Sequence, residues 1–242
     1  MSALLEVEGL SKRFGGLQAL QGVSFDVSAG EIVGIIGPNG AGKTTLFNVV
    51  TGVSPPDAGR VRFRGEDVTG APAHRLCRRG VARTFQISKP FVNLTVLQTV
   101  RIGALNRLGD MRAATAHALE VLERVGLAGK RDHLGRQLTV VERKRLELAR
   151  AVATGPALLL LDEVAAGLRP AEIQEMIALV RAISAGGVAV VIIEHVLEAV
   201  MRLSARIVVL NHGEVIARGR PEELVKDPRV IEAYLGEAYS LA

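Results

Sequence analysis

The chain has 242 residues, enough for one α/β domain or a domain plus a small subdomain. Hydrophobic residues make up 48%, which supports a sizeable core and argues against wholesale disorder, and the formal net charge of +5 requires no acidic partner. A single cysteine, Cys77, excludes an intrachain disulfide and favours a cytosolic compartment. We expect no signal peptide at the acidic N-terminus and no transmembrane helix, because no apolar run approaches about 20 residues.

Two antiparallel strands are predicted at the start of the chain. Residues 4–10 and 23–27 alternate apolar and polar side chains, as strands with one buried face do. The polar segment 12–16 between them is predicted to be a flexible turn that contains Phe14. The Phe14 ring could stack on the face of an adenine base or simply pack against its neighbours, and the sequence favours neither interpretation.

Residues 37–45 match GxxxxGK[ST], the phosphate-binding P-loop. An apolar run precedes them and a segment without Gly or Pro follows, so the pattern predicts strand, glycine-rich turn and helix, which direct backbone N–H groups at phosphate oxygens. Lys43 would contribute roughly 4 kcal/mol per charge pair with a phosphate before desolvation, at about 4 Å and a dielectric near 20. Thr44 would offer its hydroxyl to Mg²⁺. The residues predicted to hold nucleotide here are Gly37, Pro38, Asn39, Gly40, Ala41, Gly42, Lys43, Thr44 and Thr45.

The middle of the chain shows a change from strands to helices. Strands are predicted at 61–65 and 81–86, and helices at 72–79, 93–108, 111–125 and 138–154. The last of these would start at the N-cap Thr139. Its charged residues are predicted to form a solvated face: Glu142, Arg143, Lys144, Arg145 and Glu147. These helices predict a separate helical subdomain over about 90–155.

Alternation of strands and helices resumes after residue 156. Predicted here are strands at 157–161, 188–193, 205–210 and 214–217, and helices at 170–185, 196–203, 221–225 and 229–235. The sequence therefore predicts one domain over 1–242, with an α/β core and β subdomain in about 1–86 and 157–218, and C-terminal helices in 219–242.

Four polar residues follow the ends of predicted strands: Gln86, Asp162, Glu163 and His195. Because ligands gather at the carboxyl ends of strands in α/β sheets, we expect these side chains to share a site with the P-loop. A carboxylate at the end of a buried strand beside a P-loop is what Mg²⁺ coordination needs.

Over about residues 4–235 these motifs resemble the ATP-binding subunits of ABC transporters. Among these, the chain is most similar to the importer ATPases for branched-chain or hydrophobic amino acids. Subgroup motifs carry that similarity: Arg-Phe-Gly-Gly at 13–16, Phe-Asn-x-x-Thr-Gly at 47–52, Gly-x-Ala-Arg-Thr-Phe-Gln at 80–86 and Tyr-Leu-Gly at 234–236. The resemblance implies an α/β fold, namely a P-loop NTPase core of the ABC type with an N-terminal antiparallel β subdomain and a helical subdomain.

The resemblance also implies roles for individual residues in binding and hydrolysing ATP with Mg²⁺. Phe14 would stack on adenine, and the P-loop with Lys43 would hold the phosphates. Thr44, Gln86 and Asp162 would bind the metal. Glu163 would orient or deprotonate the attacking water, His195 would contact the γ-phosphate, and Thr139 would face the nucleotide of a partner subunit. The implied partners are two transmembrane permease subunits, a second ATPase subunit in a head-to-tail dimer and, indirectly, a periplasmic solute-binding protein. The implied location is the cytoplasmic face of the bacterial inner membrane.

The chain departs from the family pattern at the signature Leu-Ser-Gly-Gly-Gln, where it has Leu-Thr-Val-Val-Glu at 138–142. Thr139 keeps a hydroxyl, but β-branched residues replace both glycines, and Glu142 brings a negative charge toward the γ-phosphate unless it turns away. Val164 replaces a proline, and Arg169 an aspartate. We therefore expect pairing with a different ATPase subunit and two unequal composite sites.

Two alternatives share the same catalytic motifs. One is an ATPase of an exporter or lipid transporter. The other is a soluble ATPase acting on nucleic acid, whose phosphates could be contacted by Arg75, Arg78, Arg79, Arg83, Lys130, Arg131 and Arg136. The chain has no coiled coil, zinc cluster or added DNA-binding domain, so we expect no nucleic-acid partner.

Overall fold

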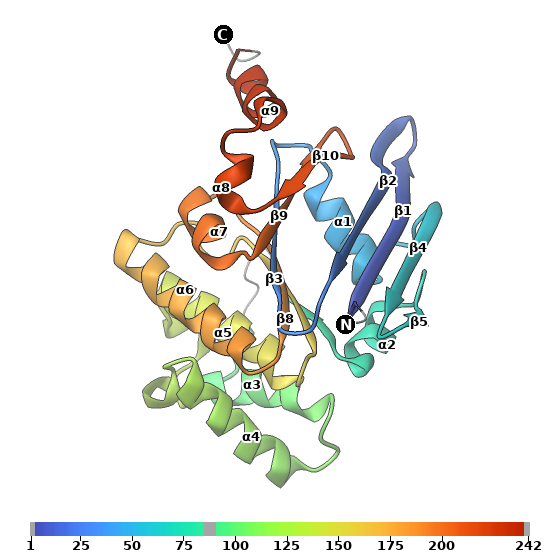
Figure 1. Cartoon of the computed structure of the whole chain (residues 1–242). Coiled ribbons are helices and arrows are strands. Elements are labelled where there is room, and N and C mark those ends of the chain that lie inside the picture. Colours follow the sequence, from blue (N-terminus) through green and yellow to red (C-terminus); the bar gives the residue numbers. More distant parts are fainter. Residues whose placement is uncertain (1–2, 85–90, 240–242) are drawn as a thin grey trace.

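The computed structural model describes residues 3–84 and 91–239 and contains two β-sheets (Figure 1). The first is antiparallel, in the order β2-β1-β4-β5, formed by β1 (Leu5–Phe14), β2 (Leu17–Val27), β4 (Ala58–Phe63) and β5 (Glu66–Asp67).

The expected polar turn at 12–16 is wrong, because β1 continues to Phe14 and only Gly15 and Gly16 close the hairpin. Lys12 stays within the strand because its ammonium donates to Asp57 Oδ1 at 2.8 Å and is largely buried. A charged side chain with a tertiary partner can thus occupy a strand position that its polarity alone argues against.

The second sheet has the order β10-β9-β3-β8-β7-β6 and is parallel except for β10, which pairs antiparallel with β9. Both of its faces are covered, as its continuous apolar strands require. Along β3, for example, Val33 and Ile35 face one core cluster while Ile32 faces the other. Its strands are β3 (Ile32–Ile36), β6 (Val81–Arg83), β7 (Leu158–Asp162), β8 (Ala189–Ile193), β9 (Arg206–Asn211) and β10 (Glu214–Gly219).

The helices divide between the two faces of this sheet. Helix α1 (Lys43–Val50) lies between the two sheets, whereas α3 (Val96–Leu105), α4 (Met111–Arg124), α5 (Val140–Ala153) and α6 (Pro170–Ala185) pack in the cluster on the other side (Figure 1). The remaining helices are α2 (Ala73–Arg79), α7 (Leu197–Leu203), α8 (Pro221–Leu224) and α9 (Pro228–Tyr239), with short 3₁₀ turns at Ala128–Lys130 and Gly135–Gln137. No helix among the described residues has the length and apolarity that a bilayer crossing requires.

Helix α5 departs from its predicted solvated face. Glu147 is buried beside Arg150, with 2.5 Å between Oε2 and Nη2, and Lys144 is half-buried. The charge run therefore does not mark one exposed side, because α5 is covered by α3 and α4 as well as by the sheet.

Candidate active site

The P-loop joins the end of β3 to the start of α1 and depends on glycine at two close approaches. Gly37 has φ 153° and Gly42, the N-cap of α1, has φ 99°. A Cβ on Gly37 would collide with the carbonyl oxygen of Leu210, and one on Gly42 with that of Ala19. Only glycine satisfies both the backbone conformation and the space, so the loop can wrap tightly around the N-terminus of α1.

Lys43 holds this loop together from inside. Its Nζ donates to the carbonyl oxygens of Gly37 at 2.6 Å and Pro38 at 2.7 Å, and the residue is 7% exposed. The ammonium thus lies at the centre of the loop, where the helix N-terminus also favours negative charge.

A cavity of about 420 Å³ opens over the P-loop and collects most of the residues predicted from sequence. Phe14 borders it from the β1–β2 hairpin, Glu163 from the end of β7, and His195 from the end of β8. Its remaining lining is Leu17, Gln18, Ala19, Asn39, Gly40, Ala41, Gly42, Lys43, Thr44, Thr45 and His212. The parallel order of β3, β8 and β7 explains this convergence, since their carboxyl ends share one edge.

Asp162, the last residue of β7, is buried and held by Arg83, and it does not line this cavity although Glu163, the next residue, does. Arg83 Nη2 donates to Asp162 Oδ2 at 2.8 Å, and Arg83 Nη1 donates to Asn48 Oδ1 at 2.6 Å. The backbone N–H of Asp162 donates to Thr84 Oγ1 at 3.1 Å. Burial raises the pKa of Asp162, and the Arg83 hydrogen bond and charge oppose that rise.

The second oxygen of this carboxylate, Oδ1, is buried and has no hydrogen-bond partner among the residues described. A buried acceptor without a donor is costly, and a hard cation is one group that would satisfy it. With the Thr44 hydroxyl on the adjacent cavity wall, the oxygen donors present fit Mg²⁺. Gln86, the third predicted metal residue, lies outside the described residues.

Glu163 has an unusual backbone and a direct contact with His195. Its φ is 52°, a left-handed conformation that costs a non-glycine residue of order 1 kcal/mol or more. Its N–H donates to Ile193 O at 2.9 Å and its carbonyl accepts from Lys144 Nζ at 2.7 Å. The carboxylate Oε1 lies 2.9 Å from His195 Nε2, so the two predicted catalytic side chains point toward each other.

The predicted N-cap Thr139 is confirmed, and it lies on the surface rather than in the cavity. Thr139 Oγ1 accepts from the N–H of Glu142 at 3.4 Å, while Glu142 Oε2 accepts from the N–H of Thr139 at 2.8 Å. Lys130 Nζ lies 3.5 Å from Glu142 Oε1, and the backbone hydrogen bond from Thr139 is the main cause that lowers the pKa of Glu142. The carboxylate therefore turns back to cap its own helix, which reduces the charge conflict expected from the sequence.

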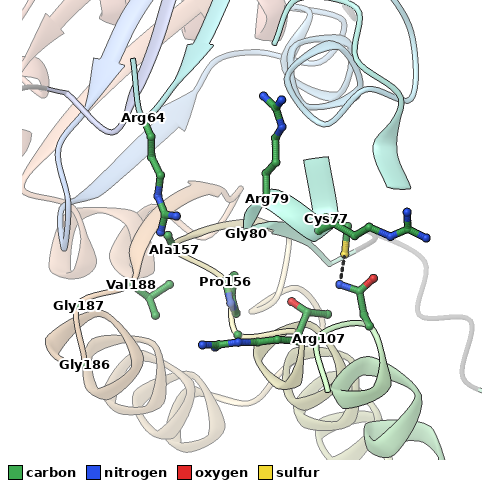
Figure 2. A pocket seen from close by; sticks show the side chains of 14 residues that line it. Arg64, Cys77, Arg79, Gly80, Arg107, Pro156, Ala157, Gly186, Gly187 and Val188 are labelled. Carbon is green, nitrogen blue, oxygen red and sulfur yellow. Dashed lines mark hydrogen bonds between the residues drawn. The ribbon is translucent and has the colours of Figure 1, made fainter. Parts of the chain in front are cut away.

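A second cavity, of about 520 Å³, lies at the opposite edge of the parallel sheet and contains arginines (Figure 2). In Figure 2 Arg64 and Arg107 reach toward Pro156 and Ala157. Arg79 pairs with Glu66, with 2.9 Å between Nη1 and Oε2. Helices α2, α3, α5 and α6 all end at this cavity, so their negative dipole ends face the guanidinium groups.

The basic residues of the nucleic-acid alternative are not gathered as one free phosphate-binding surface. Arg83 is buried against Asp162, Arg79 pairs with Glu66, and Lys130 pairs with Glu142. Several of the charges required by that alternative are therefore engaged within the chain.

Three residues at or near the site were not predicted from the sequence to belong to the nucleotide site: Arg83, Lys144 and Glu194. Arg83 and Glu194 follow the rule that found Asp162, because each lies at the carboxyl end of a parallel strand. Nothing local identifies Lys144, whose contact with the Glu163 carbonyl joins elements 19 residues apart.

Two family models match the chain: one described as ABC transporter, over residues 20–166, and one described as Branched-chain amino acid ATP-binding cassette transporter, over residues 214–240. The high-affinity branched-chain amino acid transport ATP-binding protein BraF of Pseudomonas aeruginosa is 40% identical, covering 97% of this chain and 98% of that protein. The corresponding protein LivG of Escherichia coli K12 is 39% identical with the same coverage.

Solved structures show the same architecture. A nucleotide-free ATP-binding cassette from an ABC transporter superposes with a TM-score of 0.89 at 33% identity, covering 96% of this chain and 99% of that chain. An ATP-binding cassette of an ABC transporter in its ADP conformation gives 0.89 and 33%, covering 98% and 100%. The predicted fold class is confirmed.

Proposed function

The chain belongs to the ATP-binding subunits of ABC transporters, and from that premise we propose that it hydrolyses ATP to power the uptake of a branched-chain or other hydrophobic amino acid. The observation that carries the proposal is the single cavity in which the P-loop, Glu163 and His195 meet. The substrate class is supported by the names of its relatives, which are branched-chain amino acid transport proteins.

Binding of ATP would use the P-loop, the N-terminus of α1 and Phe14. Backbone N–H groups at the start of α1 and the Lys43 ammonium supply positive charge to the phosphates. The Phe14 ring, 50% exposed at the cavity rim, offers a flat apolar face to the adenine. Lys12 Nζ lies 5.5 Å from the centroid of the same ring, at cation–π distance.

Thr44 and Asp162 would hold Mg²⁺, and Gln86 remains the third proposed ligand. When bound, the ion supplies neutralisation of charge on the β- and γ-phosphate oxygens. Arg83 keeps Asp162 Oδ2 occupied, so that Oδ1 remains the oxygen available to a cation.

Hydrolysis would place a water molecule between Glu163 and the γ-phosphate. The Glu163 carboxylate accepts a hydrogen bond from that water and orients its oxygen for in-line attack. His195 would contact the γ-phosphate with its imidazole, and it lies close enough to Glu163 to share a hydrogen bond and to respond when the γ-phosphate departs.

The proposed partners would occupy two surfaces. Exposed Thr139 and Arg169, at the N-caps of α5 and α6, would face a second and different ATPase subunit, giving two unequal composite sites. Permease subunits at the cytoplasmic face of the bacterial inner membrane would cover a mostly apolar groove of about 440 Å³, on which Val53, Phe91 and Ile102 are 44–56% exposed.

The proposal is tested by purifying the chain with its membrane subunits and measuring ATP binding, ATP hydrolysis and leucine uptake in proteoliposomes. Lys43→Ala should weaken ATP binding by about 100-fold, whereas Glu163→Gln should keep binding and lose hydrolysis by at least about 100-fold. Lys226→Met, which removes an exposed charge, is the control. Export of a lipid or other solute, or ATP hydrolysis that Glu163→Gln leaves intact, would contradict it.

A further inference from the structure

Glu194 is a buried acid that the proposed chemistry does not use. It follows β8 directly, is 3% exposed, and its Oε1 accepts from the N–H of Ala165 at 2.6 Å. Ala165 belongs to the loop after β7 that begins with Glu163. One carboxylate therefore connects the loop that carries Glu163 with the loop that carries His195.

Lys144 approaches the same loop from α5. Its Nζ donates to the carbonyl oxygen of Glu163 at 2.7 Å, and its side chain is half-buried. Burial lowers the pKa of Lys144, and the negative charges of Glu194 and Glu163 oppose that shift. The ammonium of Lys144 and the Glu194 carboxylate thus stabilise each other's charged forms, although each is taken partly out of water.

Both the N–H and the carbonyl of the strained Glu163 residue are hydrogen-bonded. The N–H of Glu163 is held by Ile193, immediately before Glu194, and its carbonyl is held by Lys144. A left-handed residue persists only where its surroundings determine its conformation, and here three elements do so: β8, α5 and the loop itself.

We propose that Lys144 and Glu194 are positioning residues, which together hold the Glu163 backbone in its left-handed conformation and keep the Glu163 and His195 side chains in register. The inference rests on the proposed ATP hydrolysis, because it assigns these residues to that reaction. Loss of either contact lets the peptide of Glu163 relax toward an ordinary conformation, which redirects its carboxylate.

The test uses the full chain in its transporter complex and two independent measurements. The variants Lys144→Ala and Glu194→Ala remove the contacts, while Lys144→Arg keeps a donor to Glu163 and Glu194→Gln keeps an acceptor for Ala165. The first measurement is amide hydrogen exchange over residues 163–169 without nucleotide. The second is steady-state ATP hydrolysis together with the Kd for ATP.

We expect the alanine variants to speed amide exchange over 163–169 by about tenfold or more. They should also lower kcat by about 10- to 100-fold while changing the Kd for ATP by less than about twofold. The conservative variants should recover most of both values. Glu147→Ala is the matched control. It removes another buried glutamate from the same helix α5, about one turn beyond Lys144, and that glutamate pairs with Arg150, so the change should alter neither exchange over 163–169 nor kcat.

Unchanged exchange in both alanine variants would overturn the inference, as would faster exchange with an unchanged kcat. A kcat loss matched by an equal loss of ATP affinity would also overturn it, because that pattern indicates general damage to the fold. If the wild-type complex hydrolyses no ATP, the proposed function fails, and the exchange data alone then decide whether Lys144 and Glu194 hold the loop.

Discussion

The two edges of the parallel sheet carry cavities of similar size, but the helix ends at the two cavities have dipoles of opposite sign. At the carboxyl edge, a cavity of about 420 Å³ is lined by the P-loop, the N-terminus of α1 and Glu163. The buried acids Asp162 and Glu194 lie at the ends of the neighbouring strands β7 and β8. At the amino edge, about 520 Å³, arginines such as Arg64 and Arg107 meet the C-termini of four helices (Figure 2).

A count of charged side chains would favour the amino edge for a phosphate site, whereas we propose the carboxyl edge. The arginines of the amino edge face partial negative charge at helix ends, whereas the P-loop offers backbone N–H groups that the helix leaves without partners. The direction of strands and helices, rather than the number of cations, therefore decides which cavity suits a nucleotide.

The largest expected difference between the edges concerns ion pairs. Arg83→Met should lower the free energy of unfolding by about 3–5 kcal/mol, because the Arg83 and Asp162 side chains are 7% and 1% exposed and the acid would lose its partner. The pair of Arg79 with Glu66 lies on the surface, so Arg79→Met should lower the free energy of unfolding by at most about 1 kcal/mol. Equal losses of unfolding free energy for the two variants, measured by urea denaturation, would contradict this distinction between the edges.

A pH titration of stability sharpens the comparison at the carboxyl edge. Burial raises the pKa of Glu194 from 4.5 to about 7, so in that range the folded chain keeps a proton that the unfolded chain releases. The resulting stability is present below pH 4.5 and is lost as the pH rises through 7, by up to about 3 kcal/mol. Glu194→Gln cannot ionise, so its stability relative to wild type should increase between pH 5 and 8.

Denaturant midpoints measured at pH 5, 6, 7 and 8 check this expectation. The exposed Glu123→Gln serves as the control and should follow the wild-type profile. Parallel profiles for Glu194→Gln and wild type would show that the carboxyl is not protonated in the folded chain at neutral pH.

A smaller effect is expected at the rim of the nucleotide cavity. Phe14→Ala should weaken ATP binding by about 1 kcal/mol, or roughly fivefold, through the loss of base stacking. Phe91→Ala removes a similarly exposed ring that does not line this cavity and should leave the Kd unchanged. Calorimetric titration with ATP would detect the difference, and equal Kd values for both variants would rule out stacking by Phe14.

The smallest effect is expected at the amino edge. Arg107→Ala should change stability by at most about 0.5 kcal/mol and ATP affinity by less than twofold, because Arg107 is an exposed residue beside Gly155 and far from the P-loop in the topology. The same titration measures it, with Lys43→Ala for comparison. A clear loss of ATP affinity in Arg107→Ala would place an anion site at this edge and reverse the comparison.

Local sequence patterns determined the elements that need only neighbours along the chain. The P-loop, the buried strands β7 and β8 that end at Asp162 and Ile193, the N-cap Thr139 and the bounds of α6 all follow from residue order, because apolar periodicity, glycine and caps act within a few residues. The carboxyl-end rule then pointed to one shared edge.

Tertiary structure alone decided which charges are buried and with whom. Lys12 stays in a strand because its ammonium donates to Asp57, which is 45 residues away in the sequence. Arg83 donates to Asp162 from another strand, and Lys144 donates to the carbonyl of Glu163 from α5. Such partners are brought together only when sheets and helices pack. The sequence alone therefore predicts that a charged residue is exposed to solvent, even where a partner across the fold allows it to be buried.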